Sequence, residues 1–214
     1  HMIERSEYMS ILKRWRDKRV IKIVTGIRRC GKSSLLRMFQ EHLIQSDVSD
    51  SQVQAINFED IDNEPFLDYH TLYSHVKSHL QDGQMNYLFF DEIQEVKNGI
   101  PSLKYFCENK RDLHVVVAGS LLGISLREEE SFPVGKVDNL RMYPMTFDEF
   151  LIANGRDLLA DCLKALDKEM LAPHHETLVE YLRQYYFVGG MPEAVLTWIE
   201  THDPSATRKV QQSI

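Results

Sequence analysis

The segment VIKIVTGIRRCGKS, residues 20–33, constrains the fold more than any other part of this chain. A run rich in β-branched residues leads into Gly26, and Gly31, Lys32 and Ser33 follow after four intervening residues. The apolar pattern then changes to helical spacing over residues 35–43. A strand, a glycine-bounded turn and a helix in that order predict a phosphate-binding loop (P-loop) in an α/β fold.

Each part of this loop suits one part of a magnesium-bound nucleoside triphosphate. Converging backbone N–H groups and the positive end of the following helix attract phosphate oxygens. Lys32 is expected to reach the β- and γ-phosphates, and the Ser33 hydroxyl to bind Mg²⁺. The predicted nucleotide-binding residues are Gly26, Ile27, Arg28, Arg29, Cys30, Gly31, Lys32, Ser33 and Ser34. The alternative is a simple glycine turn.

A second chemical segment is NYLFFDEIQ, residues 86–94. Four consecutive apolar residues predict a strand buried on both faces, and Asp91 and Glu92 stand at its carboxyl end, where doubly wound sheets bind ligands. We expect Asp91 to hold Mg²⁺ and Glu92 to orient and polarise the water that attacks the γ-phosphate. A solvent-facing acidic pair is the alternative.

The strand predicted at residues 113–118 ends in Gly119 and Ser120. If this strand lies between the first and third, Ser120 faces the γ-phosphate as a sensor, and its alternative role is a helix N-cap. Residues 109–112 spell the guanine-recognition signature NKxD of GTPases. This tetrapeptide precedes its strand instead of following it, which disfavours guanine recognition.

Composition limits the other function classes. A chain of 214 residues with 43% hydrophobic residues supports one substantial core and a small second unit. A formal charge of −7 gives no overall attraction to nucleic acid or anionic membranes. Three cysteines without paired spacing, and no signal segment or long apolar run, are typical of a soluble cytoplasmic protein.

The remaining elements are predicted from periodicity. We expect helices within 3–18, 32–45, 68–80 and 101–110, strands at 53–58 and 137–143, and a mobile loop at 121–135. From residue 146 the pattern is wholly helical, with a last helix at 193–201 and then a polar tail. Gly189-Gly190 is interpreted as a hinge or as simple helix capping.

Two smaller features have alternative interpretations. His75 and His79 are four residues apart, but Val76 stands where the zinc-protease pattern requires Glu, so a metal site is not expected. Cys30 lies at a helix amino end near Lys32, which favours a thiolate. The alternative is a small residue tolerated in the loop.

The sequences GIRRCGKS, FFDEIQ, VVVAGS and YFVGGMPEAV together resemble a prokaryotic family of AAA-type P-loop ATPases, whose members usually continue into a C-terminal domain of unknown function. The resemblance implies a P-loop NTPase three-layer sandwich with a parallel five-stranded sheet in order 5-1-4-3-2 and a helical lid. It implies an ATPase core at 1–145 and a lid region at 146–214, shortened at its carboxyl end. ATP and Mg are the implied cofactors.

One departure from that family concerns the arginine finger. Relatives often carry Gly-Arg before the fifth strand, whereas this chain has Gly135-Lys136, and an ammonium lacks the planar contact of a guanidinium. Arg127 or Arg141 is the candidate finger in a homo-oligomer.

The motifs predict Mg-dependent ATP hydrolysis coupled to movement of the helical region, with Glu92, Lys32 and Ser120 as catalytic residues. A non-hydrolysing nucleotide switch or scaffold that recruits an unidentified protein partner is the main alternative. A small-molecule kinase is a third, although kinases of that kind normally lack a water-polarising glutamate beside the metal aspartate.

Overall fold

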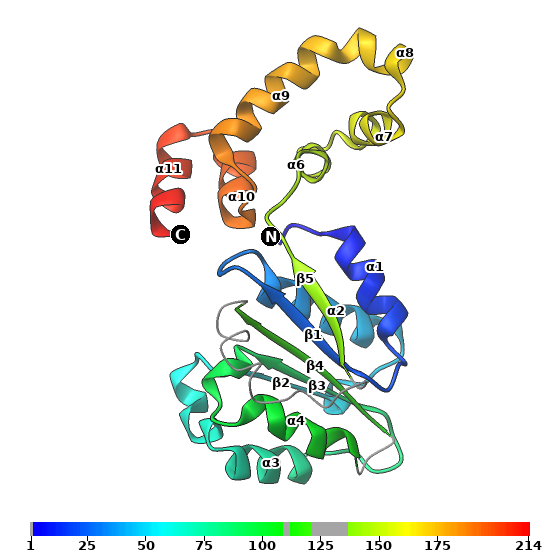
Figure 1. Cartoon of the computed structure of the whole chain (residues 1–214), viewed down its shortest axis with the longest axis vertical. Helices are drawn as coiled ribbons and strands as arrows, with labels where there is room; N and C mark the ends of the chain where they lie inside the picture. Colours follow the sequence, from blue (N-terminus) through cyan, green and yellow to red (C-terminus); the bar gives the residue numbers. More distant parts are fainter. Residues whose placement is uncertain (1, 109–111, 121–136) are drawn as a thin grey trace. The chain divides into compact units, whose positions relative to one another are not determined.

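The computed structural model describes residues 2–108, 112–120 and 137–214. Contacts divide the chain into two compact units. The α/β unit comprises Ser6–Arg28 and Lys32–Met142, and the helical unit comprises the amino-terminal residues up to Arg5, Arg29–Gly31 and Tyr143–Ile214. Figure 1 traces the elements of both units.

The α/β unit is built on one five-stranded sheet. Its strands are β1 (Ile21–Gly26), β2 (Val53–Asn57), β3 (Asn86–Asp91), β4 (Leu113–Ser120) and β5 (Val137–Met142). All neighbouring strands pair in parallel, and their order is β2-β3-β4-β1-β5. This confirms the predicted order 5-1-4-3-2, counted from the opposite edge.

Helices cover both faces of this sheet. Successive strand residues point to opposite sides, so neighbours in one strand contact different helices. Phe89 contacts Phe39 of α2 (Lys32–Ser46), with ring centroids 6.0 Å apart. The next residue, Phe90, contacts Phe106 of α4 (Gly99–Glu108) at 5.6 Å. Helix α1 (Ser6–Trp15) contacts α2, and α3 (Tyr69–Ser78) contacts α4. The three-layer sandwich is thereby confirmed.

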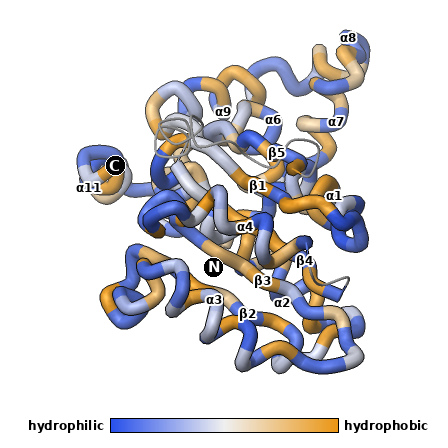
Figure 2. The backbone as a smooth tube through the Cα atoms, turned by 60° about the horizontal axis from the view of Figure 1, so that its bottom comes forward, coloured by the Kyte–Doolittle hydropathy of each residue, from blue (hydrophilic) through white to orange (hydrophobic). Residues whose placement is uncertain are grey.

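The buried strands place the candidate site residues at the carboxyl-terminal edge of the sheet. Every residue of β1 and of β3 is buried, as their apolar runs predict, and both strands contain hydrophobic (orange) stretches in Figure 2. Short 3₁₀ helices η1 (Asp50–Gln52), η2 (Ile61–Leu67) and η3 (Ile93–Glu95) lie in the connections. Because the strands are parallel, their carboxyl ends meet at the same edge of the sheet.

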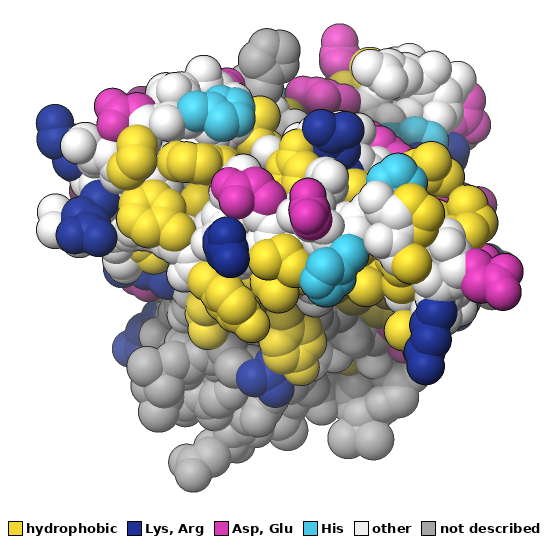
Figure 3. Space-filling view, turned by 90° about the horizontal axis from the view of Figure 1, so that it is seen from above, with side chains coloured by type: hydrophobic (Ala, Val, Ile, Leu, Met, Phe, Trp, Pro, Cys, Tyr) yellow, Lys and Arg dark blue, Asp and Glu magenta, His cyan; other side chains and the backbone are white. Residues whose placement is uncertain are grey.

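The helical unit contains six α-helices among the described residues, and a 3₁₀ turn, η4 (Ala172–His174). These are α6 (Phe147–Ala153), α7 (Asp157–Ala165), α8 (Lys168–Leu171), α9 (His175–Val188), α10 (Pro192–Thr201) and α11 (Pro204–Ser213). Phe150, Val188 and Val195 are buried in its core. Apolar side chains also reach its surface, including Leu166 and Tyr186, which are 76% and 78% exposed. Hydrophobic and charged side chains mingle on the face drawn in Figure 3.

The predicted polar tail after residue 201 is wrong, because residues 204–213 form α11. Asp203 caps this helix by accepting from the Ser205 N–H, and Pro204 occupies its first turn. Val210 packs against the core of the helical unit, and Gln211 donates to the Phe187 carbonyl at 2.8 Å. The polar composition conceals a helix that is held by contacts with α10 and by a buried Thr207.

The glycine pair between α9 and α10 has two different roles. Gly189 adopts φ +78° and its N–H donates to the Tyr185 carbonyl at 2.7 Å, which ends α9. Gly190 accepts from the Met145 N–H at 2.6 Å, and a Cβ there would lie 2.3 Å from the Met145 carbonyl oxygen. These contacts favour the capping interpretation, to which they add close backbone packing.

No helix in the described parts of the chain has both the length and the apolar character that crossing a membrane requires.

Candidate functional site

The P-loop leaves β1 at Gly26 and enters α2 at Lys32. Two of its residues, Arg29 at φ +61° and Gly31 at φ +100°, adopt left-handed backbone conformations that turn the chain sharply. The Lys32 side chain is 4% exposed, and its Nζ donates to the carbonyl oxygens of Ile27 at 2.7 Å and Gly26 at 3.2 Å. The ammonium is therefore held inside the curve of the loop.

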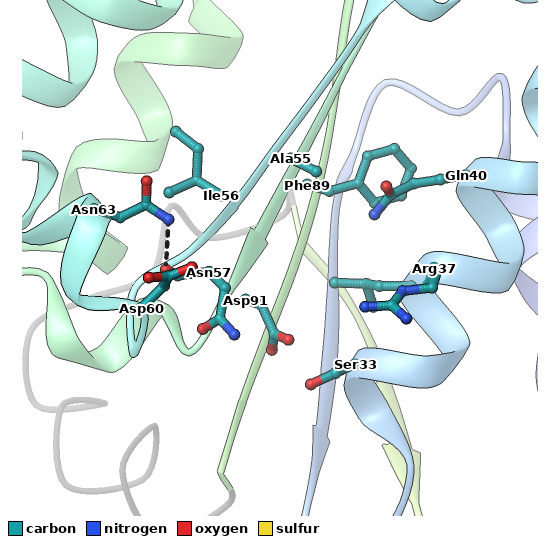
Figure 4. Close-up of a pocket in the computed structure, with 11 residues that line it drawn as sticks. Ser33, Arg37, Gln40, Ala55, Ile56, Asn57, Asp60, Asn63, Phe89 and Asp91 are labelled. Atoms are coloured by element: carbon teal, nitrogen blue, oxygen red, sulfur yellow. Dashed lines mark hydrogen bonds between the residues drawn. The ribbon is translucent and has the colours of Figure 1, made fainter. Parts of the chain in front are cut away.

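Ser33 and Asp91, the two residues predicted to hold magnesium, lie close together at the carboxyl-terminal edge of the sheet. Burial raises the pKa of Asp91, and a hydrogen bond from the Ser33 hydroxyl partly offsets that rise. Their side chains point toward one another in Figure 4, at the margin of a cavity of about 280 Å³. A carboxylate and a hydroxyl oxygen match the oxygen ligands that Mg²⁺ prefers, so these residues fit the ion.

The same cavity extends along the edge strand β2. Its polar wall includes Asn57 and Asp60, and Asn63 donates to the Asn57 carbonyl at 2.9 Å. Asn57 is the register partner of Asp91, and the Phe58 N–H donates to the Asp91 carbonyl at 3.1 Å. The backbone that carries Asp91 is thereby held by the neighbouring strand.

Glu92 begins the turn that leaves β3, and its backbone is left-handed at φ +56°. Burial raises the pKa of the Glu92 carboxyl, and the neighbouring Asp91 adds to that shift, whereas a hydrogen bond from Gln94 opposes it. Attraction to the Lys32 ammonium partly opposes the raised pKa of both acids. The ammonium of Lys32 and the two carboxylates therefore share one electrostatic environment.

Gln94 is a site residue that sequence reasoning missed. It is 9% exposed, and its Nε2 donates to the Glu92 Oε2. A glutamine two positions after a glutamate is only a weak sequence signal for this contact. The two side chains can meet only when the chain makes a tight turn directly after the strand. Here η3 supplies that turn.

Ser120 stands at the carboxyl end of β4, directly beside Gly26 of β1. This register places it on the P-loop edge, as the sensor interpretation requires. Of the candidate arginine fingers, Arg141 is an exposed residue of β5. It lies two positions before Tyr143, the first residue of the carboxyl-terminal segment of the helical unit. Arg127 and Lys136, like the predicted loop at 121–135, lie outside the described residues.

The remaining P-loop residues differ in exposure. Ile27 is 47% exposed, and the Arg28 side chain pairs with Glu59 at 3.2 Å. Ser34 is half-buried in the first turn of α2. Within the helical unit, the Arg29 guanidinium donates to the Ser213 carbonyl at 2.8 Å.

Cys30 is fully buried, with no exposed area. A reactive thiolate has to be accessible to solvent, so the structure favours the alternative interpretation of a small residue tolerated in the loop.

Two other sequence patterns contribute described residues elsewhere in the α/β unit. Asp112, the last residue of the NKxD tetrapeptide, immediately precedes β4, at the end of the sheet opposite Asp91. His75 and His79 stack with ring centroids 4.4 Å apart. No group of three or more His, Cys, Asp or Glu side chains that could hold a metal ion occurs among the described residues.

Comparison with known proteins extends these observations. A model of the AAA domain (AAA_14) matches residues 18–151, which include the P-loop, Asp91, Glu92 and Ser120. The chain belongs to the AAA domain family. The match supports nucleotide binding by this P-loop.

The AAA domain of this chain resembles proteins of known sequence and structure. An uncharacterized protein of Haemophilus influenzae is 27% identical over 91% of the chain, which spans 45% of that protein. A Walker-type ATPase of Pyrococcus abyssi has a TM-score of 0.61 at 16% identity, over 97% of this chain and 71% of that one. Caenorhabditis elegans PCH-2 has a TM-score of 0.57 at 11% identity, over 98% and 70%. These structural likenesses establish the shared fold.

Proposed function

We propose that this protein binds Mg-ATP and hydrolyses its β–γ phosphoanhydride bond. The observation that supports the proposal best is the meeting of Ser33 with Asp91, because it joins the P-loop to the acidic end of β3. Lys32 and Glu92 interact electrostatically with this pair. A triphosphate held by the loop would thus have a cation, metal ligands and a base around its terminal phosphate.

In the proposed reaction, the oxygen of a water molecule bonds to the γ-phosphorus. The bond from that phosphorus to the β–γ bridging oxygen breaks, and its electron pair leaves with ADP. Glu92 accepts the proton that the water loses, and Lys32 holds the β- and γ-oxygens. Ser33 and Asp91 would hold the Mg²⁺ ion, which neutralises phosphate charge when bound.

Coupling of ATP binding to the helical unit is supported by the assignment of three P-loop residues to that unit. Arg29–Gly31 group with α6–α11 and not with the sheet. Arg29 donates to the end of α11, and the Cys30 carbonyl accepts from Arg5 at 3.2 Å. Movement of the loop on phosphate binding would therefore be transmitted to helices of that unit, which is the lid role that we propose for residues 146–214.

The test compares the parent with Glu92→Gln, which keeps the shape of the side chain and removes its basicity. We expect ATP affinity within about twofold and phosphate release at least about a hundredfold slower. Glu95→Gln is the matched control, because Glu95 is exposed and lies three residues further on. Hydrolysis by Glu92→Gln at the parental rate would disprove the assigned base.

Phosphate release should also be measured against protein concentration. A rising specific activity would indicate that a residue such as Arg141 of a second copy completes the site. Bound ATP with no phosphate release at any concentration would instead support the non-hydrolysing switch, which recruits a protein partner.

A further inference from the structure

The Gln94 amide is buried with one end paired and the other unpaired. Its Nε2 donates to the Glu92 carboxylate. Its Oε1 is buried and has no hydrogen-bond partner in the part of the chain that the structure describes. An unpaired buried acceptor costs stability, so packing alone does not account for an amide at this position.

The backbone around Gln94 is firmly anchored. Ile93 and Val96 are 1% and 0% exposed and belong to the core on one face of the sheet. The Glu95 N–H donates to the Glu92 carbonyl at 3.0 Å, which closes the turn. Gly99 then packs so closely that a Cβ there would lie 2.8 Å from the Val96 Cβ. The amide therefore approaches Glu92 from a fixed backbone.

The bond from Gln94 also restricts a side chain that is otherwise adaptable. A glutamate at a strand end has three rotatable side-chain bonds, and one held carboxylate oxygen fixes the direction of the other. The Glu92 N–H donates to the Asp91 Oδ1 at 3.0 Å, so the backbone of Glu92 is tied to the proposed metal ligand while Gln94 holds its carboxylate.

We propose that Gln94 is a positioning residue for Glu92. Its amide N–H holds one carboxylate oxygen so that the other is presented to the attacking water. This inference rests on the proposed function, because it assigns Gln94 to the same hydrolysis. It also gives a reason for a buried amide whose oxygen has no hydrogen-bond partner among the described residues.

The test uses Gln94→Met, which keeps the length and removes both polar ends. We expect turnover to fall about tenfold to a hundredfold, with the Kd for ATP unchanged within twofold and the Tm equal or higher. Gln94→Glu retains the shape but cannot donate to a carboxylate when ionised, so it should lose turnover at least as severely.

Gln54→Met is the matched control. Gln54 on β2 donates to the Val76 carbonyl at 3.1 Å, and its Oε1 is also buried without a partner among the described residues. Gln54→Met removes the same side-chain amide at a position that does not contact Glu92, so turnover should equal that of the parent.

Three results would overturn the positioning role. The first two are turnover equal to the parent in Gln94→Met and turnover equal to the parent in Gln94→Glu. The third is a loss of turnover in Gln94→Met together with a lower Tm and weaker ATP binding, which would indicate a structural role. If Glu92→Gln hydrolyses ATP like the parent, the proposed function fails and this role with it. If Glu92→Gln is inactive while Gln94→Met is active, the positioning role alone fails.

Discussion

Arg5 and Glu149 form a two-pronged ion pair, with Nε 2.6 Å from Oε2 and the second terminal nitrogen 2.9 Å from Oε1. Arg5 is 3% exposed, and its remaining terminal nitrogen donates to the carbonyls of Cys30 and Tyr143 at 3.2 and 2.7 Å. One guanidinium therefore ties a P-loop residue to α6 within the helical unit.

Arg5→Lys should lower the free energy of unfolding by about 2–3 kcal/mol. A lysine keeps the charge but cannot supply the planar fork that serves Glu149 and two carbonyls together. Urea denaturation of the parent and the variant measures the difference. Lys13→Arg on α1, an exposed position, is the control for Arg/Lys exchange. Equal stability of Arg5→Lys and the parent would show that the fork is dispensable.

Lys32→Ala should weaken ATP binding by about tenfold to a hundredfold, which corresponds to losing charged hydrogen bonds worth about 1.5–3 kcal/mol. ADP binding should weaken less, because the ammonium is expected to reach both the β- and the γ-phosphate. Isothermal titration with both nucleotides measures the two effects. Equal losses for ATP and ADP would contradict contact with the γ-phosphate.

Gly190→Ala should destabilise the helical unit by about 3 kcal/mol or prevent its folding. The added Cβ would lie 2.3 Å from the Met145 carbonyl oxygen, and backbone would have to move. Gly189→Ala is the matched control, because its φ of +78° and ψ of −169° lie in a region that is nearly restricted to glycine and costs another residue about 1–3 kcal/mol, while the space around it is open. Thermal unfolding followed by circular dichroism ranks the two. A larger loss from Gly189→Ala would contradict the packing argument.

Lys22→Met should stabilise the protein by about 2 kcal/mol at pH 7. Lys22 is 2% exposed on β1, where burial lowers its pKa from 10.5 to about 8, against opposing attraction from groups such as Asp17. Its Nζ donates to the Lys18 carbonyl at 2.6 Å and lies 3.4 Å from His114 Nδ1, whose own pKa burial lowers to about 4. The Met side chain avoids the desolvation of the ammonium.

The pH dependence of this effect follows from proton binding. Between pH 8 and 10.5 the unfolded parent binds more protons at Lys22 than the folded parent, so the stability of the parent rises with pH. The advantage of Lys22→Met should shrink over that range and be small above pH 10.5. Denaturation curves at several pH values measure it, and a difference that stays constant with pH would refute the buried-ammonium explanation.

Local sequence patterns were enough to predict the sheet and the central part of the site. The apolar runs before Gly26 and Asp91 identify fully buried strands, and parallel pairing then leaves little freedom in where Ser33 and Asp91 can lie. The order of the strands came from family resemblance, because periodicity does not specify which strands are neighbours.

What escaped prediction depends on contacts between residues far apart or on a single turn. In the sequence, Arg5 is one charged residue in a polar amino-terminal stretch. No local pattern indicates that it pairs with Glu149. Helix α11 looks polar because only a few residues such as Val210 anchor it. Lys22 interrupts an otherwise apolar strand, and a pattern gives no indication that its ammonium is buried beside His114.

The parallel sheet also decides when this protein is able to fold during its synthesis. Among the described strands of this sheet, β1 leaves the ribosome first, yet its two neighbours are β4 and β5, which are made last. Until residues near 142 have emerged, the strand that carries Gly26 lacks both partners and its apolar side chains stay uncovered. Nascent chains should therefore be open to chaperones until β5 has emerged, and ATP can help to stabilise them only after that point.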